Sequence, residues 1–110
     1  MVISDAIAGK VITSLPIGDR CDGVAFDPEL KRAYSSNGDG TITVVQEVDK
    51  DNFKVLENIV SQKGARTITL DKSTHRLYLP TAEFEPTQAG ARRPATKPGT
   101  FMILEVALVK

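Results

Sequence analysis

The 110-residue sequence has few of the residues on which many functional sites depend. It contains no tryptophan, one cysteine (Cys21) and one histidine (His75), and aromatic residues make up 5% of the chain. A single cysteine excludes an intrachain disulfide. A lone histidine outside any cluster of cysteines, histidines or carboxylates is a poor metal ligand, and no cysteine–histidine nucleophile pair is visible. We therefore expect no catalytic residue, no metal and no cofactor.

The sequence also lacks a charge imbalance and a long apolar run. Fourteen basic and fourteen acidic residues give a formal net charge of +0, so nothing in the charge favours nucleic acid or an anionic membrane as a partner. No apolar run approaches the roughly 18 residues needed to cross a bilayer. The N-terminal stretch MVISDAIAGK lacks the basic and apolar regions of a signal peptide. We expect neither nucleic acid nor membrane as a partner, and the localisation remains unknown.

What the sequence does have is an internal repeat. A displacement of 44 residues superposes identical residues and apolar residues: Asp27 on Asp71, Arg32 on Arg76, Tyr34 on Tyr78, Val24 on Ile68, and Phe26 on Leu70. The next match, GTIT from Gly40 with GTFM from Gly99, needs a larger displacement. The second copy is therefore expected to be longer than the first, with the extra residues between Pro80 and Gly99.

Each copy consists of short segments in which β-branched residues alternate with polar or small ones, separated by turn sequences such as DPELK and NGDG. This pattern predicts strands and no helix. The predicted strands are Lys10–Leu15, Asp22–Phe26, Arg32–Ser36, Thr41–Val48, Phe53–Val60, Arg66–Leu70, Arg76–Leu79 and Thr100–Val106. Residues 81–99 are rich in proline and small residues and are expected to form a long, mobile loop.

Four short strands in a repeat of this length are typical of one blade of a β-propeller. We therefore predict a single all-β domain over residues 1–110, a propeller fragment of about two four-stranded antiparallel blades. Residues 10–15 form the outer strand of a first, incomplete blade, and MVISDA is a candidate for another strand of that blade. Residues 22–60 form a complete blade. Residues 66–106 form the last blade, with the insertion at 81–99.

The segments GKVITSLPIG, CDGVAFDPELKRAYSSN and GTITVVQ resemble the repeat of the YVTN β-propellers, which are related to lactonase-like and WD-repeat propellers. The second copy, ARTITLDKSTHRLYLPT with GTFMILEV, is similar but more divergent. The resemblance covers residues 3–107. It implies a ring that usually has six to eight blades. It also implies a family whose members are often exported and whose lactonase-like members hydrolyse esters or lactones.

Several motifs have a simple structural interpretation. NGDGT places oxygen-bearing side chains as calcium loops do, but Val48 stands where the closing acidic residue belongs, so we predict a hairpin turn. Asp27 and Asp71 are predicted to accept hydrogen bonds from backbone N–H groups two residues on. His75 is predicted to be an exposed turn residue and Cys21 a small buried one. The basic stretch 90–97 is predicted to be a solvated loop.

In an antiparallel meander, successive connections lie at alternate ends of the strands. This rule predicts where a binding site would lie. Connections between neighbouring blades share one face of the ring with the turns between the second and third strands of each blade. Five charged or polar residues of these connections are the candidate ligand-binding residues at the mouth of a central channel: Arg20, Asp22, Asn37, Asp39 and Arg66. The alternative is that Asp22 and Arg66 pair with each other or face solvent.

The sequence favours a non-catalytic binding or scaffold module that assembles with itself. No fourth-strand pattern follows residue 106, and Lys10–Leu15 is a spare strand that could complete the last blade of the next subunit. Such an exchange closes most naturally as a trimer of six blades or a tetramer of eight. A small molecule or a peptide is the expected ligand. Two alternatives stay open: a lactonase- or esterase-like hydrolase acting at the channel mouth, and a propeller remnant without its own activity.

Overall fold

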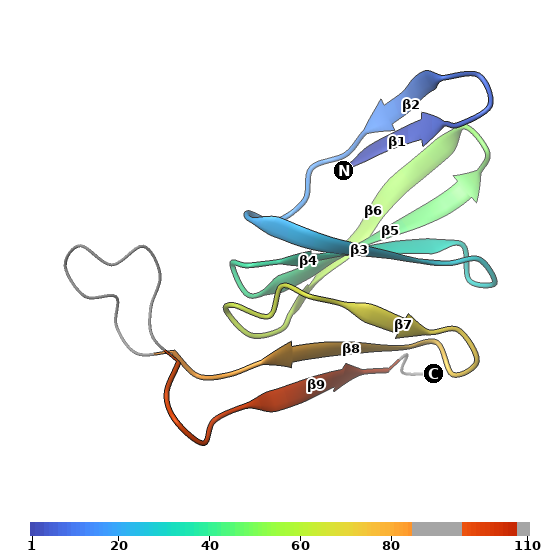
Figure 1. Cartoon of the computed structure of the whole chain (residues 1–110). Coiled ribbons are helices and arrows are strands. Elements are labelled where there is room, and N and C mark those ends of the chain that lie inside the picture. The colour runs from blue at the N-terminus through green and yellow to red at the C-terminus, as the bar shows by residue number, and fades with distance from the viewer. Residues whose placement is uncertain (85–95, 108–110) are drawn as a thin grey trace.

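The computed structural model describes residues 1–84 and 96–107, and this part of the chain is all β, without a helix (Figure 1). Nine strands follow one another: β1 Val2–Asp5, β2 Lys10–Ser14, β3 Cys21–Asp27, β4 Arg32–Asn37, β5 Thr41–Asp49, β6 Asn52–Val60, β7 Thr69–Asp71, β8 Arg76–Thr81 and β9 Met102–Val106. The strand pattern of the sequence is thereby confirmed, and the N-terminal segment forms a strand that pairs with β2.

The strands form three antiparallel sheets in the order of the chain: β1–β2, β3–β4–β5–β6 and β7–β8–β9. In Figure 1 the β1–β2 hairpin stands at one extreme, the four-stranded sheet lies in the middle and the three-stranded sheet lies at the other extreme. Short polar turns join neighbouring strands. In the turn between β5 and β6, for example, Asp49 Oδ1 accepts hydrogen bonds from the Asp51 N–H and from Asn52 Nδ2.

Strand β7 is shorter than predicted, because pairing with β8 begins only at Thr69. In this register the residue opposite Thr67 would be Pro80, which has no N–H to donate to a neighbouring strand. Strand β9 likewise begins at Met102 rather than Thr100. Two predictions, the mobile loop at 81–99 and the solvated basic stretch at 90–97, concern mainly residues 85–95. These residues lie outside the described part of the chain.

Some backbone features recur at a displacement of 44 residues. The β3–β4 ladder pairs Asp27 with Arg32, and the β7–β8 ladder pairs Asp71 with Arg76, 44 residues further on. Residues with positive φ also correspond at this displacement: Arg20 (59°) with Gly64 (88°), and Lys31 (56°) with His75 (60°).

The third strands correspond in a different register from the one the sequence indicated. Tyr34 pairs with Val44, whereas Tyr78 pairs with Glu105, where the match of GTIT with GTFM would place Ile103. The third strands are therefore displaced by two residues more than that match indicates, and the correspondence inferred from the two glycine motifs was wrong. The glycine match misled because it marks a turn, whereas strand pairing is set by which residues face the core. A difference of two residues preserves that facing.

The core lies between the four-stranded and the three-stranded sheets. It joins buried residues from both, namely Tyr34, Ile42 and Val44 with Leu77, Leu79 and Ala65. Partly buried apolar residues surround it: Ile59, Ile68, Leu70, Leu104 and Val106. The first strands of the two sheets, β3 and β7, which are edge strands, also contact each other. Each sheet therefore has an inner face, which contributes to this core, and an outer face directed away from it.

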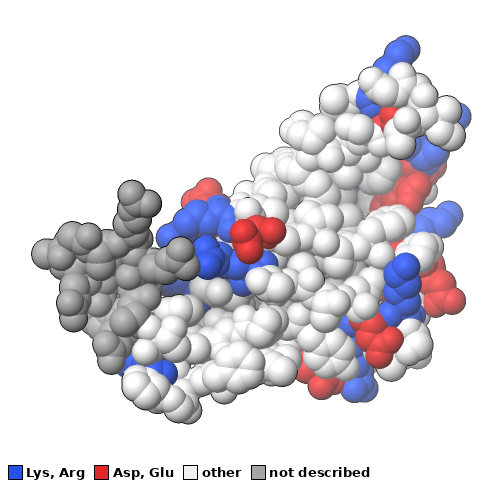
Figure 2. Space-filling view, viewed as in Figure 1, with Lys and Arg blue, Asp and Glu red and all other residues white. Residues whose placement is uncertain are grey.

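The outer faces follow from strand alternation. Since Tyr34 points into the core, Ala33 and Ser35 point to the opposite face, together with their cross-strand partners Phe26 and Val24. Val24 and Phe26 are exposed on this face, whereas Ser35 is fully buried. On the three-stranded sheet, Tyr78 and Pro80 point outward with their partners Glu105 and Ile103. In Figure 2 charged side chains gather at two margins of the molecule, and the broad surface between them carries none.

Candidate functional site

Three connections meet at one end of the sheets, which we call the loop end: residues 15–20, the turn 37–41 and residues 61–65. The Gly38 N–H donates a 2.9 Å hydrogen bond to the Arg20 carbonyl, and the Gly64 N–H donates a 3.1 Å hydrogen bond to the Gly38 carbonyl. The backbone thus joins the entry to β3, the β4–β5 turn and the link to the three-stranded sheet. Alternation of the connections predicted this grouping.

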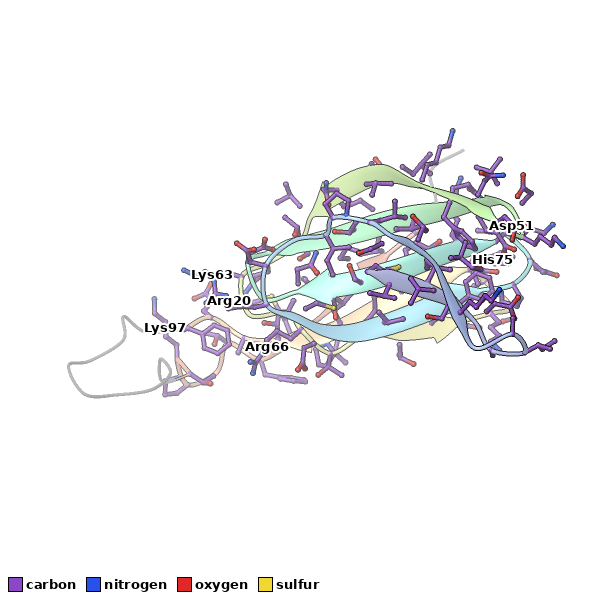
Figure 3. The ribbon with its side chains drawn as sticks, turned by 90° about the horizontal axis from the view of Figure 1, so that it is seen from above. Arg20, Asp51, Lys63, Arg66, His75 and Lys97 are labelled. Atoms are coloured by element: carbon purple, nitrogen blue, oxygen red, sulfur yellow. The ribbon has the colours of Figure 1, made fainter. Side chains whose placement is uncertain are left out.

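Two of the predicted site residues, Arg20 and Arg66, flank Gly38. A Cβ atom at this glycine would lie 3.2 Å from Arg20 Cβ and 3.3 Å from Arg66 Cδ. Lys63 and Lys97 are at the same end (Figure 3). Among residues 1–84 and 96–107, none of these four cations lies within 4.0 Å of a carboxylate. The loop end therefore presents unpaired positive charge within the described structure.

The predicted acidic and amide residues have other roles. Asp39 accepts hydrogen bonds from the Asp19 N–H (2.9 Å) and from the hydroxyl of Thr41 (2.6 Å), and these bonds, that of Thr41 first, lower the pKa of its carboxyl. Asn37 is fully buried and its amide donates to Thr41 and Thr43. Asp22 is exposed and makes no ion pair with Arg66 in the described residues.

The NGDGT motif is therefore a turn, as predicted. Gly40 within it has a φ of 96°, and its N–H donates to the Asn37 carbonyl at 3.1 Å. No group of three or more potential metal ligands occurs in the part of the chain that the structure describes.

Next to Arg66 lies an open pocket of about 310 Å³. Its lining residues include a basic residue, two threonines and two aromatic residues, namely Arg66, Thr67, Thr81, Phe84 and Phe101. A guanidinium group beside two aromatic rings suits a small ligand with an anionic group and an apolar body. Arg66 was singled out in the sequence, but the two phenylalanines were not, because Phe84 lies within the predicted loop 81–99 and Phe101 within the predicted strand Thr100–Val106.

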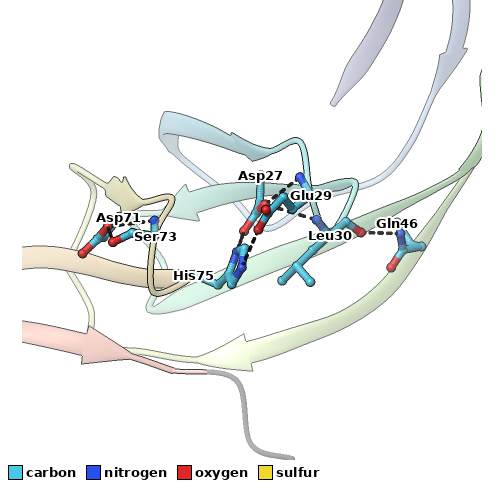
Figure 4. A network of polar contacts seen from close by, with 7 residues as sticks. All are labelled: Asp27, Glu29, Leu30, Gln46, Asp71, Ser73 and His75. Atoms are coloured by element: carbon cyan, nitrogen blue, oxygen red, sulfur yellow. Dashed lines mark hydrogen bonds and ion pairs between the residues drawn. The ribbon is translucent and has the colours of Figure 1, made fainter.

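The opposite end of the sheets carries a cluster of charged residues that the sequence did not indicate (Figure 4). His75, in the β7–β8 turn, places Nδ1 2.5 Å from Asp27 Oδ2 and Nε2 2.9 Å from Glu29 Oε2. Asp27 is fully buried, and its Oδ1 accepts hydrogen bonds from the N–H groups of Glu29 (3.0 Å) and Leu30 (3.2 Å). The cluster joins the four-stranded sheet to the three-stranded sheet.

The surroundings of His75 favour its charged form. The hydrogen bond to Asp27 raises the pKa of the imidazole, burial opposes this, and the charges of Asp27 and Glu29 raise it further. Burial alone would raise the pKa of Asp27, but the hydrogen bonds from His75 and from backbone N–H groups bring it below 3.8. With both ring nitrogens held by carboxylates, His75 has no free nitrogen to act as a general base. The cluster is a clasp between sheets, and we refer to it as the His75 clasp.

A second cavity, of about 360 Å³, opens beside the His75 clasp between β6 and β9. Glu57 and Ile59 of β6 line one side, and Leu77 and Val106 of the three-stranded sheet line the other. At this place the four-stranded sheet has a fourth strand, β6, whereas the described three-stranded sheet ends at β9.

Two individual predictions are wrong. His75 is not an exposed turn residue, because its side chain is 24% exposed and is bonded to Asp27 and Glu29. Cys21 is not buried but exposed, since it opens β3, which is an edge strand of its sheet. The turn role of Asp27 and Asp71 is confirmed, because each accepts a 3.0 Å hydrogen bond from the N–H two residues on.

Comparison of the chain with family models, with curated proteins and with solved structures finds no match. Among the described residues there is no helix that is long and apolar enough to span a membrane.

Proposed function

We propose that the protein is a non-catalytic binding or scaffold module of β-propeller type, in which copies of the chain pack head to tail into a ring. One observation carries the proposal. The outer faces of the two larger sheets correspond in position to the two inner faces that form the core, and apolar residues recur at Val24, Phe26 and Tyr78.

The correspondence follows from the displacement of 44 residues that the ladders share. Val24 and Phe26, on the outer face of the four-stranded sheet, correspond to Ile68 and Leu70, which pack on the core from the three-stranded sheet. Tyr78, on the outer face of the three-stranded sheet, corresponds to the core residue Tyr34. The outer face of the three-stranded sheet can therefore dock on the outer face of the four-stranded sheet of a second copy, in the relation already found within one chain.

The exposed apolar residues on these faces favour such docking. Val24 is 61% exposed, Phe26 45% and Ile103 59%, and Phe101 next to β9 is 71% exposed. If each outer face presents about 500 Å², comparable with the largest apolar patches of soluble monomers, covering one pair of faces contributes roughly 25 kcal/mol at about 25 cal/mol per Å². This exceeds an association cost of roughly 4–15 kcal/mol.

Strand pairing supports the same arrangement. Within the described residues the second edge of β9 is unpaired, and the cavity between β6 and β9 leaves room beside it. The β1–β2 hairpin makes its ladder only within itself and exposes Val2 and Val11. We propose that β2 of one copy pairs with the free edge of β9 and completes the three-stranded sheet of the next copy as its fourth strand. This contact is heterologous, and with two blades per copy the ring closes as a trimer or a tetramer.

The binding part of the proposal places the ligand at the loop end. In such a ring the innermost strands β3 and β7 surround a central channel, and the loop ends of all copies lie around one mouth of it. Arg20, Asp22 and Arg66 then recur around this mouth. Positive charge on Arg20 and Arg66 favours an anionic small molecule or peptide.

Light scattering on two matched variants tests the proposal. Ile103→Lys places a charge on the proposed contact face, and Val48→Lys places it on an equally exposed valine (57%) near the β5–β6 turn. We expect the wild type and Val48→Lys to form one discrete oligomer and Ile103→Lys to form smaller particles. Deleting residues 1–15 should also yield smaller or aggregating species. Oligomers of unchanged mass for Ile103→Lys and for the deletion would contradict the proposal.

A further inference from the structure

The two residues that correspond to the His75–Asp27 pair in the other copy of the repeat do not contact each other within the described chain. At the displacement of 44 residues, Asp27 corresponds to Asp71 and His75 corresponds to Lys31. Inside one chain the clasp joins the aspartate that ends the first strand of one sheet to the turn residue of the following sheet. The remaining pair of the repeat, Asp71 and Lys31, consists of an acid and a base.

The two turns have the same local geometry. Lys31 has a φ of 56° and His75 a φ of 60°, so their side chains leave the backbone in the same way. Asp71 accepts a 3.0 Å hydrogen bond from the Ser73 N–H, as Asp27 does from the Glu29 N–H. In both aspartates it is Oδ1 that accepts this bond.

The second carboxylate oxygen distinguishes the two aspartates. Asp27 Oδ2 binds His75, whereas Asp71 Oδ2 makes no ion pair among the described residues. Lys31 is exposed and also makes no ion pair in the described part of the chain. Each group of the second pair therefore lacks the ionic partner that its counterpart in the first pair has.

From this geometry we infer that Lys31 of one copy forms an ion pair with Asp71 of the neighbouring copy, repeating the His75 clasp across the interface between copies. The inference rests on the proposed head-to-tail ring, in which the outer face that carries Asp71 docks on the sheet whose turn carries Lys31. The three N–H donors of the lysine replace the imidazolium as partner of the carboxylate.

The pair is placed to set the register of the interface. Within the chain, a second polar contact joins the sheets at the loop end, where the Ser36 hydroxyl donates to the Arg66 carbonyl. The residue that corresponds to Ser36 is Pro80, which has no hydroxyl. The interface between copies thus lacks this hydroxyl contact, and the Lys31–Asp71 pair is the counterpart of the ion pair between His75 and Asp27.

Substitutions of the two charged residues test the inference. Asp71→Asn keeps an oxygen acceptor for the Ser73 N–H while removing the charge, and Lys31→Glu reverses the partner. Lys72→Glu, which alters an exposed lysine in the same turn as Asp71, is the matched control. Dissociation of the oligomer on dilution is followed by light scattering. Melting curves establish that each variant folds.

We expect Asp71→Asn and Lys31→Glu each to raise the dissociation constant of the oligomer, by up to roughly 5-fold for the loss of one exposed ion pair. The charge-exchanged double variant Lys31→Asp with Asp71→Lys should return to within about twofold of the wild type. Lys72→Glu adds negative charge beside Asp71 and leaves the Asp71 carboxylate in place, so it should not weaken the oligomer. An intact ring whose dissociation does not change in any variant would overturn the ion pair but leave the ring. A monomeric wild type would overturn both.

Discussion

The imidazole of His75 and the carboxylate of Asp27, far apart in the chain, meet at 2.5 Å across the boundary between two sheets. At the other end of the same boundary the Ser36 hydroxyl bonds to the Arg66 carbonyl. The apolar core lies between these two polar contacts. The two sheets are thus joined at both ends, which fixes their orientation relative to each other.

The first prediction concerns pH. The pKa of His75 is raised above 6.5, so its stabilisation is fully present below pH 6.5 and is lost as the pH rises through the folded-state pKa. The pKa of Asp27 is lowered below 3.8, so its stabilisation is present above pH 3.8 and is lost as the pH falls through the folded-state pKa. We expect the melting temperature to peak between these values. A melting temperature that rises steadily from pH 6 to pH 9 would contradict the clasp.

The second prediction isolates the clasp by substitution. His75→Asn keeps a residue that tolerates the positive φ of 60° but removes the bridge to Glu29 and the charge beside Asp27. We expect the melting temperature to fall by several degrees and its decline above pH 6.5 to disappear. Lys72→Asn, in the same turn but without an ion-pair partner in the described residues, should leave both unchanged. The readout is thermal unfolding followed by circular dichroism.

The third prediction separates core from interface. Leu79 is fully buried between the sheets, so Leu79→Ala should lower the free energy of unfolding by about 2–5 kcal/mol. Ile103→Ala removes an apolar side chain that is 59% exposed in one copy. It should scarcely affect unfolding of the dissociated chain but should weaken the oligomer. Urea titration and light scattering on the same samples distinguish the two effects, and equal loss of folding stability in both variants would refute the assignment of faces.

The fourth prediction concerns two glycines with positive φ. Gly64 (φ 88°) has no room for a methyl group, because a Cβ atom there would collide with the ring of Phe84. Gly9 (φ 66°) has open space around it. Gly9→Ala should cost only the backbone strain, about 1–2 kcal/mol, and Gly64→Ala should cost clearly more because the packing of Phe84 is also disturbed. The two midpoints of urea unfolding provide the comparison.

Much of the fold could be predicted from alternation and turn residues. β-Branched residues at alternate positions and Asp, Asn and Gly at the turns located the strands, because both signals are local. The start of β7 could not be predicted in this way, since it depends on Pro80 in the neighbouring strand. The register of β9 could not be predicted either, because the matching glycines at 40 and 99 mark turns and not paired positions.

The candidate sites were predictable only in part. The alternation of connections between the two ends of the strands predicted that Arg20 and Arg66 lie at the same end. In the structure both residues lie next to Gly38. The His75 clasp was missed, because its partners Asp27 and Glu29 lie in the preceding repeat and a lone histidine carries no spacing signal. One signal was present in the sequence: His75 corresponds to Lys31 at the displacement of 44 residues. The two residues share a positive φ in the same turn, and in this turn the His75 side chain lies beside Asp27 of the preceding sheet.

The central claim is that copies of the chain assemble head to tail through faces that repeat the core. Native mass spectrometry of the wild-type chain at micromolar concentration tests it most directly. Our account predicts one dominant species at three or four times the chain mass of 11.9 kDa. A folded monomer or an isologous dimer as the dominant species would contradict it.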